Sequence, residues 1–136
     1  MMSRLRQIAK IASLALIICL GHAGARADSL SADITTGWVG DIPVPADALI
    51  ETDSAVNFDS PSGRVIRFTF QVALNEDDVN AYYKETLAGL GWHVAGPLYQ
   101  RGSEAMLIEA GDGASSGGGR MAYRVTLAPA DSAAFQ

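Results

Sequence analysis

The feature that most constrains this chain is an amphipathic helix predicted between Asn75 and Trp92, the only convincing helix beyond the N-terminal segment. Asn75 suits the N-cap, because its side-chain oxygen can accept a hydrogen bond from an unpaired backbone N–H one turn later. Three consecutive acids follow at 76–78, where the positive end of the helix dipole favours negative charge. Gly91 can adopt the left-handed conformation that ends a helix. Trp92 is then expected to open a strand.

One face of this helix is mostly apolar, with its side chains three and four residues apart, the spacing of a single helical stripe. The opposite face carries polar side chains such as Asn80, Lys84 and Glu85. A helix with one apolar stripe must bury it against another layer of structure. The stripe consists of Val79, Tyr82, Tyr83, Thr86, Leu87 and Leu90.

The residues around this helix read as strands and turns. The clearest strand is 64–72, where apolar and polar side chains alternate with the period of two that marks a half-buried strand. Residues 120–127 alternate in the same way. The apolar face of the first strand is Ile66, Phe68, Phe70 and Val72, and that of the second is Met121, Tyr123, Val125 and Leu127.

Weaker patterns predict the remaining strands. Residues 55–58 and 104–110 read as short strands, and 92–99 as a strand interrupted at Pro97, which cannot donate to a ladder. Residues 46–51 fit either a short strand or a helical turn. The predicted fold class is α+β, in the order β-β-α-β-β-β. A four- to five-stranded, mostly antiparallel sheet would carry the helix packed on one face.

The first 27 residues have the three parts of a secretory signal peptide: a basic start, an apolar core at 11–20, and the small-x-small site Ala25-Arg26-Ala27. The uncharged run is shorter than the about 20 residues that span a bilayer. We therefore expect a periplasmic protein cleaved after Ala27. The alternative is membrane anchoring by an uncleaved signal or by lipid on Cys19, although Ile18 replaces the small residue that normally precedes a lipidated cysteine.

Cleavage would leave a lead-in at 28–45, a single α+β domain at 46–128 and a fraying tail at 129–136. The mature chain would contain no cysteine, because Cys19 is the only one. It would keep all 15 acids but only six of the 10 basic residues, a formal net charge of −9. This acidity argues against nucleic acid and against anionic membrane surfaces as binding partners.

Motifs for catalysis, metals or cofactors are weak in this sequence. The glycine-rich loop 111–119 lacks the lysine and the following helix of a phosphate-binding loop. The acids at 76–78 point around a helix and do not converge, and His93 has no evident partner for a metal site or a catalytic triad. We expect no catalytic residues, no metal ligands and no cofactor.

A small basic patch is the candidate interaction site. Arg67 lies beside Thr69 on the polar face of one alternating strand, and Arg124 beside Thr126 on the polar face of another. If the two strands are neighbours, these side chains form a patch suited to an acidic partner. Pairing of the arginines with nearby acids is the alternative. Trp38, in the lead-in, is expected to help this face bind another envelope protein.

Part of the chain resembles small exported bacterial proteins and lipoproteins of uncharacterised function. The pattern is the aromatic pair Tyr82-Tyr83 followed by Leu90-Gly91-Trp92, preceded by an extended stretch like 42–48 and followed by Arg101-Gly102. The resemblance covers 43–127. It implies the fold and export, but no particular chemistry.

The sequence thus favours a non-catalytic periplasmic binding module, an accessory subunit of an envelope protein complex. A carrier of a small apolar ligand held between helix and sheet is the first alternative, and an enzyme with an unrecognised site is the second. A cavity between the Tyr82-Tyr83 helix face and Phe68 and Phe70 would favour the carrier. A packed core with an exposed apolar patch would favour the binding module.

Export gives the first testable prediction. The intact mass of the protein from a periplasmic extract should match a chain that begins at Asp28, because the signal peptidase would cut after the small residue Ala27. A mass that includes Met1, or one that carries lipid on Cys19, would contradict this cleavage.

Overall fold

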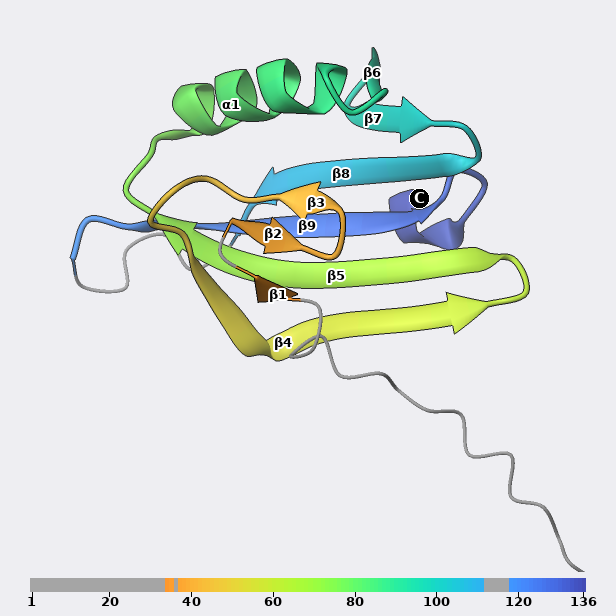
Figure 1. Ribbon diagram of the computed structural model, residues 1–136, viewed down its shortest axis with the longest axis horizontal. Coiled ribbons are helices and arrows are strands. Elements are labelled where there is room, and N and C mark those ends of the chain that lie inside the picture. The colour runs from red at the N-terminus through yellow and green to blue at the C-terminus, as the bar shows by residue number, and fades with distance from the viewer. Residues whose placement is uncertain (1–33, 36, 112–117) are drawn as a thin grey trace, which may run out of the picture.

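The computed structural model describes residues 34–35, 37–111 and 118–136, and its main layer is a six-stranded antiparallel sheet (Figure 1). One helix, α1 (Glu76–Ala88), packs on this sheet, and a small three-stranded sheet lies on the same side. In spatial order the main strands are β4 (Leu49–Ser60), β5 (Gly63–Val72), β9 (Met121–Pro129), β8 (Glu104–Ala110), β7 (Leu98–Arg101) and β6 (His93–Ala95). The small sheet comprises β1 (Ile34–Thr35), β2 (Trp38–Val39) and β3 (Ile42–Pro43).

The α+β class and the antiparallel sheet are confirmed, but the sheet has six strands rather than four or five. The predicted interrupted strand at 92–99 is wrong in detail. Its residues form β6 and most of β7, two antiparallel strands with Val94 opposite Tyr99. The chain reverses at Gly96-Pro97, where Gly96 has a φ of 62°, a conformation that glycine adopts at low cost. The strands β6 to β9 then follow one another as a meander.

The first long strand, β4, extends well beyond the short strand predicted at 55–58. It also contains much of the ambiguous segment 46–51. The pairing of β4 with β5 shifts register between Glu51 and Val56, so the apolar alternation changes phase inside the strand. A single period of two therefore does not run through β4, which explains why the sequence pattern was weak there.

The caps of α1 follow the chemistry that the sequence predicts. The Asn75 side chain accepts a hydrogen bond from the backbone N–H of Asp78 at 2.9 Å. At the other end, Gly91 has a φ of 84°. The N–H of Trp92 reaches the carbonyl of Leu87, and that of Gly91 reaches the carbonyl of Ala88. These two bonds are the Schellman pair, which satisfies carbonyls that the helix end would otherwise leave free.

The core lies between one face of the main sheet and α1. Phe68 and Phe70 on β5 are fully buried, as the strand alternation predicts. From the helix, Tyr83 and Leu87 are also fully buried, whereas Tyr82 packs only partly against the cluster. The same cluster includes Val72, Val79, Trp92, Met106, Tyr123, Val125 and Leu127.

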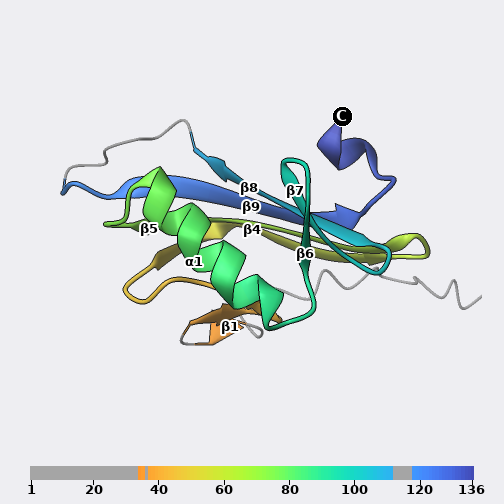
Figure 2. The same ribbon diagram turned by 90° about the horizontal axis from the view of Figure 1, so that it is seen from above.

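The segment before residue 46, predicted to be a flexible or extended lead-in, contributes to this core where the structure describes it. Val39, Ile42 and Val44 are buried in the main cluster, so the small sheet covers part of the same face as α1. Figure 2 shows α1 crossing the main sheet obliquely. In the same view β1 lies on one side of the main sheet, and the C-terminal turn η2 (Ala133–Phe135) lies on the other side. The last residues, expected to fray, thus include a short 3-10 turn capped by Ser132.

Some predictions fall outside the described residues. The signal peptide 1–27, its cleavage site and Cys19 all lie before residue 34, and most of the glycine-rich loop lies at 112–117. Within the described residues, no helix is long and apolar enough to cross a membrane.

The packing of β5 gives a paired test of strand orientation. Phe70→Ala should lower the free energy of unfolding by about 3–5 kcal/mol, because it removes a fully buried ring and leaves a cavity. Arg67→Ala, on the other face of the same strand, should change it by no more than about 0.5 kcal/mol. Denaturant melts of both variants measure the difference, and equal losses would contradict the assigned faces.

Candidate functional site

The predicted basic patch occupies two neighbouring strands, as its interpretation required. β5 pairs with β9 so that Arg67 lies opposite Thr126 and Thr69 lies opposite Arg124. The four side chains therefore form one block on the face of the sheet that points away from α1. Both arginines are exposed, whereas Thr126 is buried, with only 4% of its surface accessible. Thr126 therefore presents no free hydroxyl surface to a partner.

Acidic side chains border this block on the next strands. Glu51 of β4 lies opposite Thr69, and Glu109 of β8 lies opposite Arg124. The ion pairs found among the described residues nevertheless involve neither Arg67 nor Arg124. Glu51 instead accepts a hydrogen bond from Gln71 at 2.8 Å. The two guanidinium groups are thus not neutralised by a close carboxylate in the described part of the chain.

An apolar strip lies beside the basic block on the same face. Val56 is opposite Arg67, and Phe58 is opposite Val65. Val56 is 48% exposed and Phe58 is 51% exposed, so the two side chains form a small exposed apolar area on this strand. We call Val56, Phe58, Arg67 and Arg124 the open-face patch.

Trp38 does not lie with the open-face patch, contrary to the expectation that it would help this face. Trp38 belongs to β2, and its neighbour Val39 is buried in the cluster beneath the covered face. The main sheet therefore separates Trp38 from Arg67 and Arg124. The lead-in packs on the covered face because the residues that it buries, Val39 and Ile42 among them, are apolar.

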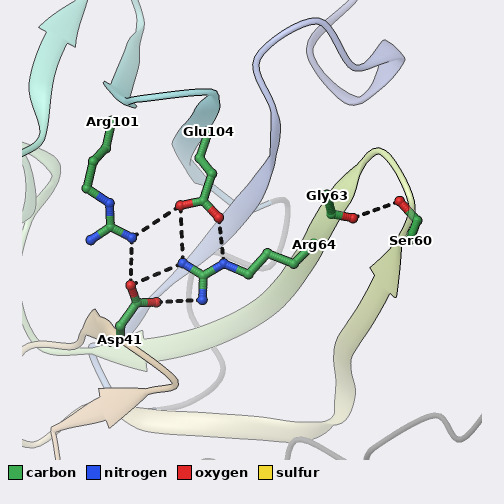
Figure 3. Close-up of polar contacts among 6 residues, drawn as sticks. All are labelled: Asp41, Ser60, Gly63, Arg64, Arg101 and Glu104. Carbon is green, nitrogen blue, oxygen red and sulfur yellow. Dashed lines mark hydrogen bonds and ion pairs between the residues drawn. The ribbon is translucent and has the colours of Figure 1, made fainter.

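A cluster of four charged side chains, which the sequence reading missed, closes one end of the covered face (Figure 3). Arg64 Nε donates to Glu104 Oε1 at 2.6 Å, and Arg64 Nη1 lies 2.9 Å from Asp41 Oδ1. Arg101 Nη2 donates to Asp41 Oδ2 at 2.6 Å and to Glu104 Oε2 at 3.2 Å. Each acid thus contacts both arginines. We call these four residues the charge tetrad.

The charge tetrad joins three parts of the fold. Asp41 comes from the β2–β3 turn, Arg64 from β5, and Glu104 and Arg101 from the adjacent strands β8 and β7. The guanidinium carbon of Arg101 also lies 4.4 Å from the centroid of the buried Trp92 ring, a cation–π contact. This arrangement joins the small sheet to the main sheet. It also covers the ring of Trp92, the aromatic residue that follows α1 in the chain. We interpret it as structural.

Both carboxyl groups of the tetrad are stabilised in their charged form. Hydrogen bonds from Arg64, and then from Arg101, lower the pKa of Glu104 despite its partial burial. For Asp41, burial favours the neutral acid, but hydrogen bonds from the same two arginines outweigh it and lower the pKa. The hydrogen bond to Glu104 is the largest cause of the raised pKa of Arg64. All four groups are therefore charged at neutral pH.

Two signals in the sequence could have singled out Arg64 and Glu104, two members of the tetrad. Arg64 has the same strand parity as Ile66 and Phe68, so period two already places it on the covered face. Glu104 has the same relation to Met106, which is fully buried. A charge at the end of an apolar face must reach water or find a partner. The partner Asp41 was not predictable, because no local pattern places the β2–β3 turn there.

A groove of about 1020 Å³ lies at the other end of the covered face. Its walls are the β3–β4 connection, the first half of β4 and Tyr82 of α1. Apart from Asp47, its lining consists of apolar or neutral residues, including the 57% exposed Leu49. Arg120 holds the connecting loop, since its Nη1 donates to the Asp47 carbonyl at 2.7 Å and to the Gln71 carbonyl at 3.2 Å.

Other residues singled out by the sequence stand apart. His93 and the first-turn acids at 76–78 are exposed, and the Asp78 N–H serves the Asn75 cap. Across the described ranges, no group of three or more His, Cys, Asp or Glu side chains could hold a metal ion. Comparison with known proteins adds no family: no family model, curated protein or solved structure matches the chain.

The tetrad predicts a pH-dependent stability. Glu104→Gln should lower the free energy of unfolding at neutral pH by about 1–2 kcal/mol, since it weakens charge-assisted hydrogen bonds to two arginines. Because the folded-state pKa of Glu104 lies below its ordinary 4.5, its contribution is complete above that value and is lost as the pH falls through the folded pKa. The difference between the two proteins should therefore be largest above pH 4.5 and should shrink as the pH falls below that value and through the folded pKa.

Urea melts across this range measure the effect. Glu85→Gln, an exposed change on α1, is the matched control and should show no comparable loss. A Glu104→Gln loss that stays constant down to the lowest pH would contradict the assigned role of the carboxylate.

Proposed function

We propose that this protein is a non-catalytic binding module, exported to the periplasm, that acts as an accessory subunit of an envelope protein complex. The open-face patch would dock the partner. The observation that carries the proposal is the combination of two exposed arginines, which form no ion pair with the described residues, with two half-exposed apolar side chains on adjacent strands.

The apolar part of the patch would supply contact area. Val56 and Phe58 lie on the edge strand β4, where a partner can approach them without displacing another element of the described fold. Exposed aromatic and aliphatic side chains that adjoin a polar rim are typical of protein–protein interfaces. Their burial would stabilise a complex by about 25 cal/mol for each Å² of apolar surface removed from water.

The charged part would supply orientation and specificity. The expected mature chain has a formal net charge of −9. Two neighbouring arginines without an ion pair among the described residues therefore form a local region of positive charge on an acidic molecule. An acidic patch on the partner would be attracted to this face and repelled by most of the rest of the surface. This contrast favours one docking orientation over others.

The packing of the core favours a binding module over a carrier with an internal cavity. The rings of Phe70 and Tyr83 lie 6.3 Å apart between centroids, and both side chains are fully buried. Phe70 also stacks on Tyr123 at 5.6 Å. The second candidate, a carrier of a small apolar ligand, would instead use the groove beside Tyr82, whose lining is largely apolar.

Charge reversal on the open face tests the proposal. Arg67→Glu combined with Arg124→Glu should leave the melting temperature nearly unchanged but weaken copurification with envelope partners at native expression. The loss should be greatest at low salt, because salt screens exposed charges over about 10 Å at 0.1 M. The control is Lys84→Glu, a charge reversal at an exposed position of α1. Its effect on copurification is compared with that of the single variant Arg124→Glu.

A doubly reversed protein that keeps every partner at every salt concentration would place the docking surface elsewhere. The outer face of α1, with Asn80, Lys84 and Glu85, would then be the next surface to test.

A further inference from the structure

The edge strand β4 has one side that pairs with no other strand of the described fold. Strand β4 stands at one end of the six-stranded order, and its only neighbour there is β5. It is 12 residues long and contains neither proline nor lysine, two residues that commonly protect sheet edges. A row of backbone N–H and C=O groups along such an edge can accept another strand.

The pairing within the sheet is weakest in the middle of β4. Residues 49–51 pair with β5 and residues 56–60 pair with it again, but 52–55 have no opposite residue because the register shifts there. A bulge of this kind disrupts the ladder locally and bends the strand. The regular stretches on either side of it, 49–51 and 56–60, are therefore the parts of β4 that can align with another strand, and the bulge limits pairing between them.

The groove beside Tyr82 adjoins the same stretch of strand. Ala48, Leu49, Ile50 and Thr52 line the groove, so a chain added along β4 would have a largely apolar space next to it. Asp47 holds a φ of 62°, an uncommon conformation for a residue other than glycine, and Arg120 fixes its carbonyl. This conformation shapes the loop that forms one wall before any partner is present.

The charges around this edge identify the chemistry of the occupant. Asp47, Glu51 and Asp53 are acidic, and no basic side chain lines the groove. A second copy of β4 would bring Glu51, Asp53 and Asp59 against the same acids, and like charges across paired strands are destabilising. A basic segment would be attracted to the edge, so the edge favours a different chain over a second copy.

We infer that β4 binds an extended segment of a partner protein by strand addition, and that this segment alternates apolar residues with lysine or arginine. Backbone hydrogen bonds to β4 would provide the main contact, and an apolar side chain would enter the groove near Leu49 and Tyr82. This edge is separate from the arginines of the open-face patch, and the inference holds whether or not that patch docks a partner.

A synthetic peptide that alternates valine and lysine over about nine residues, the length of an ordinary strand, tests the inference directly. Binding to the full mature chain is measured by calorimetry, and its location by backbone amide hydrogen exchange. The peptide should bind and should slow exchange along 49–58. A peptide with glutamate in place of lysine should bind at least about tenfold more weakly, because it faces the same acids with the opposite charge.

Two further peptides test the backbone contact. One carries N-methyl groups on every lysine and the other on every valine, so that each lacks the N–H donors along one of its edges. Strand addition requires that at least one of them lose binding. Equal binding of both methylated peptides and the parent peptide would overturn the inference, as would slowed exchange confined to other strands or no binding at millimolar peptide.

Two surface variants complete the experiment without altering the core. Asp53→Lys should weaken the valine–lysine peptide about tenfold at low salt, and Leu49→Ala should weaken it several-fold at any salt. The control Glu85→Lys makes the same change of charge as Asp53→Lys at a distant exposed site on α1, and it should have little effect on peptide affinity. Both variants should keep the wild-type melting temperature within about 2 °C, because each alters an exposed side chain.

The remaining outcomes are also decisive. Unchanged peptide affinity in both Asp53→Lys and Leu49→Ala would overturn the inference. Concentration-dependent dimerisation that Asp53→Lys strengthens or abolishes would assign the edge to a second copy and overturn it as well. The doubly reversed Arg67 and Arg124 variant should bind the peptide no more weakly than wild type, which separates this site from the two arginines of the open-face patch.

Discussion

Phe70 lies at the centre of the covered face, with the ring of Tyr83 on α1 and the ring of Tyr123 on β9 packed against it. The other elements of the fold shield the apolar side chains of this face from water. The Tyr123 hydroxyl donates to the Leu74 carbonyl at 3.0 Å, which fixes the chain just before α1 begins. The sheet is wider than one helix can cover, so the small sheet must bury the remaining apolar surface with Val39 and Ile42.

The charge tetrad holds the small sheet in place at the edge of the covered face. A small sheet of two-residue strands has little backbone pairing of its own, so its position depends on side chains. Asp41 supplies two oxygens to Arg64 and Arg101 at the turn where the small sheet meets the main one. Partial exposure keeps the cost of desolvating these ions moderate. A hydrogen-bonded network at the rim therefore fixes the covering layer without a charge in the centre of the core.

The sequence predicted the parts of the fold that depend on local patterns. The α1 caps and the alternation of β5 and β9 follow from short-range patterns. The patch of Arg67 and Arg124 was predicted only on the condition that their strands are neighbours, and β5 and β9 are neighbours. The sequence failed where long-range contacts decide. Trp38 lies across the sheet from Arg67 because Val39 is buried among residues distant in sequence, and the phase change in β4 concealed half of that strand. Direct contacts within the tetrad join residues as far as 60 positions apart, so no local pattern could have assembled it.

The two faces of the sheet differ in how much the stability of the fold depends on them. On the covered face, the Tyr83 hydroxyl is buried with no hydrogen-bond partner among the described residues, an arrangement that costs free energy and that the surrounding packing must offset. On the other face, Val56, Phe58 and Arg67 make few contacts that the fold requires, since each is largely exposed. Substitutions there can alter a binding surface while the core stays intact. The sheet thus carries its main core on one face, while the other face exposes Val56, Phe58 and Arg67 among the described residues.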